Sequence, residues 1–134
     1  MANDQTQEDT TMIHFDDVRL SHARQRLQAA GREADATARR LGRLAGVRWA
    51  EHHATPEDLV AACGFEPDED ASSGDEQWAA AVREMPSLAA YVDGLDDGRS
   101  EFARYLRVRP MPLLLGFLEG ARELSDALHS PEWA

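Results

Sequence analysis

The apolar residues in the first half of the chain repeat with the period of an α-helix. Between Phe15 and Ala54 they step by three and four residues, and this segment lacks proline and is rich in alanine, arginine and leucine. The repeating residues are Leu20, Ala23, Leu27, Ala30, Ala34, Ala38, Leu41, Ala45 and Trp49. The pattern predicts one long helix with a single buried face.

A helix of this length is difficult to cover within one small domain. It would measure roughly 55 Å at about 1.5 Å per residue, whereas a compact domain of this size has a radius of gyration of roughly 14 Å. Either the helix breaks near Gly31, or a second molecule covers its free half. We favour a continuous or mildly kinked helix. We therefore expect a homodimer through the N-terminal half, where Leu20 and Leu27 would otherwise be exposed.

Two pairs of glycines with the same spacing indicate a close crossing of helices. Gly42 and Gly46 lie four residues apart in the long helix, and Gly116 and Gly120 repeat this spacing near the C-terminus. Glycine costs about 1 kcal/mol in a helix relative to alanine, so the pairs suggest that another backbone must come near. Charged residues interrupt both segments, which argues against a membrane helix. The sequence predicts that the first and last helices pack antiparallel at these glycines.

Capping and stop signals divide the rest of the chain into shorter helices. The run Thr55-Pro56-Glu57-Asp58 is typical of a helix start with a capping box, and no segment shows the alternation of a strand. The expected helices are 56–63, 76–85, 86–92, 97–108 and 112–129, with an extended joint at 109–112. We predict an all-α, single-domain bundle of about five helices, in which the long N-terminal helix packs against the C-terminal helix.

The polar N-terminus marks the predicted domain boundary. Residues 1–11 have no apolar period and are expected to form a disordered arm, followed by a single helical domain over 12–130. No apolar run approaches the length of a membrane span or signal sequence, so a cytoplasmic location is expected. The single cysteine, Cys63, excludes an internal disulfide framework and is expected to be a small buried hydrophobe.

Three short motifs resemble a recurring pattern of an uncharacterised family of small bacterial helical proteins. They cover about a third of the chain, and all are structural: glycine spacings, a helix cap and a buried tryptophan. The motifs are Gly42-x-x-x-Gly46-x-x-Trp49-Ala50, Ala54-Thr55-x-Glu57-Asp58-Leu59 and Gly116-Phe117-x-Glu119-Gly120-Ala121. The resemblance implies a helical fold and no known activity.

The charge of the chain is unevenly distributed. The formal net charge is -11, and all fourteen basic residues are arginines. Residues 16–54 carry eight arginines against five acids, whereas residues 55–101 carry two arginines against thirteen acids. Such an acidic segment would repel phosphate backbones and could attract a basic protein, or it could serve only solubility. The expected interaction residues lie in two turns: Asp68, Glu69, Asp70, Asp96 and Asp97.

The only cluster of histidine and carboxylate side chains is Glu51-His52-His53. Adjacent helical residues point about 100° apart, so the two histidines cannot share one metal as an i, i+4 pair does. A helix C-terminus that favours imidazole explains them as well. They are therefore weak metal candidates. A cavity near Trp49, His52 and His53 would support a ligand-binding or enzymatic role.

No phosphate-binding loop, nucleophile elbow or zinc spacing appears in the sequence, so no cofactor and no enzymatic activity are predicted. We expect a non-enzymatic interaction or regulatory protein, such as an immunity or antitoxin-like adaptor that presents acids to a basic protein partner. The alternatives are the enzyme or metal-binding domain described above and an acidic mimic of nucleic acid. Direct binding to nucleic acid is disfavoured by the charge.

Overall fold

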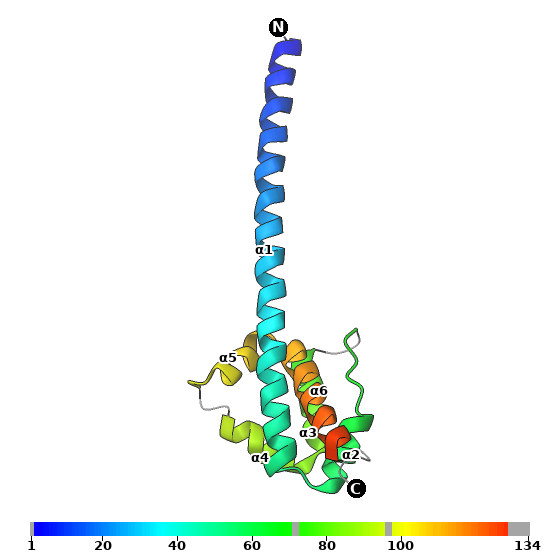
Figure 1. The fold of residues 1–134 in the computed structure, drawn as a ribbon. Helices are drawn as coiled ribbons and strands as arrows, with labels where there is room; N and C mark the ends of the chain where they lie inside the picture. The colour runs from blue at the N-terminus through cyan, green and yellow to red at the C-terminus, as the bar shows by residue number, and fades with distance from the viewer. Residues whose placement is uncertain (1, 71–72, 96–97, 129–134) are drawn as a thin grey trace. The chain divides into compact units, whose positions relative to one another are not determined.

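The computed structural model describes residues 2–70, 73–95 and 98–128, with side chains from Asp17 onward, and within these ranges it contains six helices and no strand. The helices, shown in Figure 1, are α1 (Ala2–His52), α2 (Pro56–Gly64), α3 (Gly74–Glu84), α4 (Pro86–Leu95), α5 (Glu101–Val108) and α6 (Pro110–Leu128). The predicted all-α class is confirmed. The number of helices is six rather than about five.

The chain divides into two units, Met1–Glu33 and Ala34–Ala134. The first unit contains the N-terminal part of α1, and the helical assignment continues through Gly31, where the sequence allowed a break. The second unit contains the remainder of α1 and helices α2 to α6. Helix α1 begins at Ala2, inside the stretch 1–11 expected to be a disordered arm. The boundary between an arm and a domain at residue 11 stays a prediction.

Three of the six described helices, α2, α3 and α5, begin at a side-chain cap. The Thr55 hydroxyl accepts from the Asp58 backbone N–H, and the Asp58 carboxylate accepts from the Thr55 N–H, both at 3.2 Å. This is the reciprocal capping box that the sequence predicts for α2. Ser73 caps α3 and Ser100 caps α5 in the same way, through their hydroxyl oxygens.

Two pairs of helices are joined by a single residue. Met85 lies between α3 and α4, and Arg109 lies between α5 and α6. The predicted extended joint at 109–112 is therefore wrong beyond Arg109. Pro110 and Pro112 fall in the first turn of α6, where a missing N–H removes no helical hydrogen bond. A reversal between antiparallel helices usually takes two to five residues, so these joints form corners.

Helix α6 occupies the centre of the second unit. It contacts α2, α3 and α5, and it packs against α1 at the glycine crossing described below. Phe117 is fully buried on α6. Its ring centroid lies 5.4 Å from that of Trp49, 5.6 Å from that of Trp78 and 6.4 Å from that of Tyr91. These aromatic contacts bring α1, α3 and α4 to the same core.

The four glycines lie where α1 and α6 cross. A Cβ atom on Gly42 would lie 2.1 Å from the Leu113 carbonyl oxygen, and one on Gly46 would lie 2.0 Å from the Phe117 oxygen. From the other side, a Cβ on Gly116 would lie 2.0 Å from the Arg39 oxygen, and one on Gly120 would lie 2.2 Å from the Arg43 oxygen. These distances leave no space for a side chain, so the two backbones are in direct contact.

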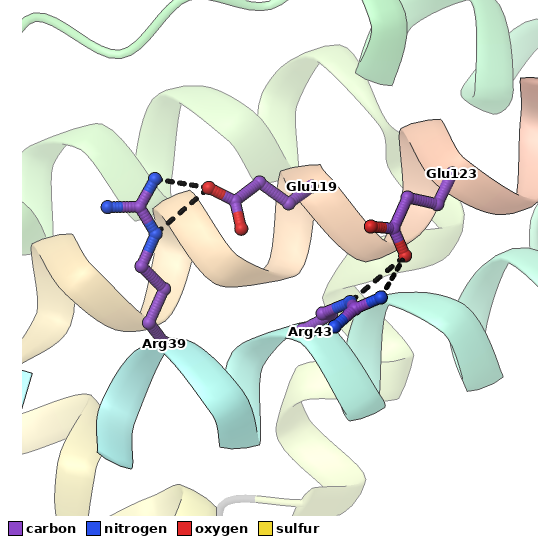
Figure 2. A network of polar contacts seen from close by, with 4 residues as sticks. All are labelled: Arg39, Arg43, Glu119 and Glu123. Carbon is purple, nitrogen blue, oxygen red and sulfur yellow. Dashed lines mark hydrogen bonds and ion pairs between the residues drawn. The ribbon is translucent and has the colours of Figure 1, made fainter. Parts of the chain in front are cut away.

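The two helices run parallel at this crossing, and the predicted antiparallel packing is wrong. Arg39 pairs with Glu119 and Arg43 pairs with Glu123, so a step of four residues on α1 matches a step of four residues in the same direction on α6 (Figure 2). The Arg39 Nε lies 2.9 Å from Glu119 Oε1, and an Arg43 nitrogen lies 2.8 Å from Glu123 Oε2. Both pairs are about half exposed, where an ion pair contributes about 0–1 kcal/mol. They therefore fix the register of the crossing more than its stability.

Candidate functional site

The histidine cluster lies at the end of α1 and does not form one site. The His52 side chain is 64% exposed, and its Nε2 lies 3.8 Å from Glu51 Oε1. The His53 ring instead contacts the Tyr91 ring in a tilted arrangement, with the ring centroids 4.9 Å apart. Both residues line an open depression of about 550 Å³, which Ser87 also lines. Among the described side chains, no three metal-ligating residues are grouped closely enough to hold an ion.

Trp49 is fully buried and is part of a structural hydrogen-bond chain. Its indole N–H donates to the Ser87 hydroxyl at 3.2 Å, and that hydroxyl donates to Oδ2 of Asp58. The Asp58 carboxylate is buried as well, and it accepts from the Thr55 N–H in the capping box. The chain therefore ties α1, α2 and α4 together, and it uses the polar atoms that a ligand near Trp49 would need.

The acidic turn after α2, Asp68 to Asp70, is held by a side chain of α3. Asp68, Glu69 and Asp70 are all exposed. The Asp68 backbone N–H donates at 2.9 Å to Oε1 of Gln77, a buried glutamine on α3, and the Asp70 N–H donates to an Asp68 carboxylate oxygen at 3.1 Å. These bonds give three neighbouring carboxylates a fixed backbone.

Glu69 is close enough to α1 to influence it electrostatically. The pKa of Arg39 is raised first by its hydrogen bond with Glu119, against an opposing effect of burial, and further by the charges of Glu119 and Glu69. The acidic turn therefore lies near the Arg39 end of the glycine crossing.

The second acidic turn cannot be described in the same detail, because Asp96 and Asp97 lie outside the described residues. The flanking segments lie on the other side of the second unit. In Figure 1 the connection after α2 is on the right of α1 and α6, whereas α5 and the end of α4 are on the left. The arrangement gives no support to one continuous acidic surface that combines both turns.

A groove lined by three arginines, two apolar residues and two glutamates lies along the second-unit part of α1. It has a volume of about 530 Å³ and is formed by α1 residues 40–51 together with Glu123 of α6. Leu44 is 58% exposed, although it sits in the middle of this segment. Arg40 and Arg48 lie one helical turn to either side of it and are exposed as well. The sequence analysis did not identify this groove, although the arginine content of the segment was visible.

The first unit also carries uncovered apolar side chains. Leu20 is 56% exposed and Leu27 is 73% exposed on α1. Both residues belong to the repeat from which a buried face was predicted. Within the described part of this chain they remain largely uncovered.

The structure corrects the prediction for Cys63 and shows contacts of Arg122 that the sequence did not predict. Cys63 is exposed rather than buried, because it lies on the outer side of α2. Arg122 of α6 donates through Nε to the Ala62 carbonyl oxygen at 3.1 Å and through a terminal nitrogen to the Phe65 carbonyl oxygen. It thereby satisfies the C-terminal end of α2, and no pattern in the sequence pairs these distant residues.

No known protein family, curated protein or solved structure matches this chain. The function therefore has to be inferred from the site geometry alone. Within the described ranges, no helix combines the length and the apolar character that crossing a membrane requires.

Proposed function

We propose that the protein is a non-enzymatic interaction or regulatory protein, of the immunity or antitoxin-like adaptor type, that presents a fixed acidic turn to a basic protein partner. The observation that carries the proposal is the bond between the buried Gln77 and the Asp68 backbone. A solubilising loop does not require a buried side chain to hold it. A recognition loop benefits from one, because preorganisation lowers the entropy lost on binding.

The role of the turn in this proposal is electrostatic. Asp68, Glu69 and Asp70 are exposed on one short segment, so they attract a basic surface and speed encounter, and salt weakens the attraction. Asp96 and Asp97 stay candidates for a second acidic contact. A helical bundle serves as the rigid support of the turn in this proposal.

The experiment compares the wild-type protein with a variant in which Asp68→Asn, Glu69→Gln and Asp70→Asn are combined. A partner is first captured from cells that express the protein naturally, and the association rate is then measured with purified components at several salt concentrations. The variant is expected to bind more slowly and with a weaker salt dependence. Its melting temperature should change little, since exposed charges contribute little to stability.

The matched control removes the same number of charges elsewhere. Glu33→Gln, Glu84→Gln and Asp126→Asn are combined, because these acids are exposed and lie outside both acidic turns. This control should associate nearly as fast as the wild type. If both variants associate at the wild-type rate and with the wild-type salt dependence, the acidic turn serves solubility and the proposal is wrong.

The described side chains give less support to the alternatives. For a ligand-binding, metal-binding or enzymatic role, Trp49 is buried with its N–H engaged, and the His52 side chain is largely exposed to solvent. A mimic of nucleic acid would need regularly spaced acids, whereas the described acids of the turn lie on an irregular loop.

A further inference from the structure

The groove on α1 is centred on a stripe of four residues that points away from the glycine crossing. At 100° per residue, the stripe covers about 60° of the helix surface, and its centre is about 150° around the helix from that of the two glycines. Helix α6 packs on the glycine side, so the stripe lies on the far side of α1. In order along the helix, the stripe consists of Arg40, Leu44, Val47 and Glu51.

The charges at the two ends of the stripe cannot neutralise each other within one chain. Arg40 and Glu51 are eleven residues apart, which is about 16 Å along a helix. Among the described side chains, Arg40 has no carboxylate within salt-bridge distance, and its guanidinium donates to the Thr37 hydroxyl at 3.1 Å. The Glu51 carboxylate has no arginine partner there, and the His52 Nε2 lies 3.8 Å from it. Both end charges are therefore available to a partner molecule.

The stripe is complementary to its own reversed copy. The step from Arg40 to Leu44 equals the step from Val47 to Glu51. If two copies pack antiparallel about a twofold axis, Arg40 of each copy faces Glu51 of the other, and Leu44 faces Val47. The twofold repeats every contact, so one dimer gains two ion pairs and two apolar contacts. In a parallel pair like charges would face each other, so the charges favour the antiparallel direction.

We propose that the occupant of the groove is the same stripe of a second copy of this chain, packed antiparallel. The contact uses only residues 40–51, which belong to the second unit. It is therefore a different surface from the N-terminal half of α1, where the sequence predicts a dimer contact. The inference does not depend on the proposed acidic turn.

The arginines beside the stripe limit the strength of this contact. Arg43 lies on one side and is paired with Glu123. Arg48 lies on the other side, and it has no carboxylate within salt-bridge distance among the described side chains. A twofold axis places Arg48 on the same side of the contact in both copies, where the like charges repel. The dimer is therefore expected to dissociate on dilution.

The first test measures self-association of the full-length chain by sedimentation over a range of concentrations. The wild type is expected to form a dimer that dissociates as it is diluted. Arg40→Glu places two carboxylates opposite each other at both ends of the contact, and Glu51→Arg does the same with two guanidinium groups. Each substitution should weaken the dimer by about tenfold or more.

The controls for these substitutions are Arg83→Glu and Glu84→Arg, which reverse exposed charges on α3. Neither residue lines the groove, so both variants should dimerise like the wild type. Circular dichroism of each variant checks that the helical fold is retained.

The pairing and the direction are tested by combining the two charge reversals. In an equimolar mixture of the Arg40→Glu protein and the Glu51→Arg protein, opposite charges meet again at both ends of the contact. This mixture should form a heterodimer, although neither protein dimerises well alone. A single chain carrying both substitutions should also dimerise, because the antiparallel contact then has its two charges exchanged.

The apolar centre of the contact is tested with Leu44→Gln. Leu44 is 58% exposed, so the substitution should leave folding nearly unchanged while it weakens the dimer. Val60→Gln is the matched control, because Val60 is 74% exposed on α2 and lies outside the groove.

Four results would overturn the proposal. The first is a wild type that stays monomeric at every concentration, and the second is a dimer that both charge reversals leave unchanged. The third is a doubly substituted chain that fails to dimerise, since the contact is then not the antiparallel one. The fourth is a Leu44→Gln variant that dimerises as well as Val60→Gln does.

Discussion

Glycine at position 46 determines how closely two backbones can approach. Because an added Cβ would lie 2.0 Å from the Phe117 carbonyl oxygen, even Gly46→Ala should force α1 and α6 apart. We expect a loss of at least about 1–3 kcal/mol in unfolding free energy, the usual range for overpacking. Gly46→Leu should cost more. Urea denaturation of the purified variants measures this.

Gly94→Ala is the matched control for that substitution. Gly94 is also in a helix, but nothing lies within 4 Å of an added Cβ there. Alanine at this position should be neutral or should stabilise the protein by up to about 1 kcal/mol, because it restricts the unfolded chain. Equal effects of Gly46→Ala and Gly94→Ala would contradict the close crossing.

Tyr91 makes stability sensitive to high pH. Partial burial raises the pKa of its phenol above the ordinary value of 10.0, against an opposing effect of the Arg48 charge. Because the folded state holds this proton more tightly than the unfolded state does, the contribution is complete below pH 10 and is lost as the pH rises through the raised pKa. The phenol also donates to the Ala45 carbonyl oxygen at 3.2 Å.

The substitution Tyr91→Phe tests this expectation. At pH 8 the wild type should be more stable by about 0.5–1.5 kcal/mol, the net contribution of one hydrogen bond. The difference in melting temperature should narrow as the pH is raised beyond 10. A difference that stays constant up to pH 11 would show that folding does not raise the pKa of Tyr91.

At the scale of elements, Arg122 connects α6 to the end of α2. Its two bonds to the Ala62 and Phe65 carbonyl oxygens satisfy groups that a helix C-terminus leaves without partners. Arg122→Met should destabilise the protein by about 1–3 kcal/mol, and amide exchange should accelerate in α2 more than in α3. Arg122→Lys should recover only part of the loss, since an ammonium lacks the fork geometry of guanidinium. Uniform exchange across both helices would argue against this role.

Local signals in the sequence were sufficient to find most helix boundaries. The capping box at Thr55 and Asp58 depends on residues only three positions apart. Pro86 stands at the first position of α4, which proline favours. Both signals act within one helical turn, so they can be recognised in the sequence. The direction of α6 could not be found in this way. A row of glycines at intervals of four reads the same from either end, so it predicts contact between helices but not their polarity. The single-residue corners at Met85 and Arg109 decide the polarity, and corner geometry is a tertiary property.

The polar connections between elements were also invisible in the sequence. Ser87 lies 38 residues from Trp49 and 29 residues from Asp58, yet its hydroxyl joins both. Serine is common on helix surfaces, and only the folded chain distinguishes this one. The groove at Leu44 was hidden for a related reason: Leu44 stands outside the apolar repeat of α1, and the sequence alone does not show which face of the helix α6 covers.

At the scale of the whole molecule, the core belongs to the second unit. All buried core residues that the structure describes lie between Ala38 and Ala121. We therefore expect a fragment of residues 34–134 to fold without the first 33 residues, with retained helical circular dichroism and cooperative melting. A fragment that melts without cooperativity would show that the first unit contributes to the core.

The crossing of α1 and α6 joins residues that are far apart in the chain. Arg39 and Glu119 are separated by 80 residues, so closing this contact requires a large loss of chain entropy, and contacts of this kind slow folding. We expect the crossing to form after the rate-limiting step. Gly120→Ala should then mainly accelerate unfolding and leave refolding nearly unchanged, which stopped-flow kinetics can measure.

The same separation has a consequence for the chain as it is synthesised. At roughly 5–20 residues per second, the 80 residues between Arg39 and Glu119 take on the order of 4–16 s to translate. During this time the glycine face of α1 has left the ribosome, or is leaving it, while its partner helix does not yet exist. The nascent helix is then bare on both of its faces. Both faces are therefore open to other proteins until α6 has been synthesised.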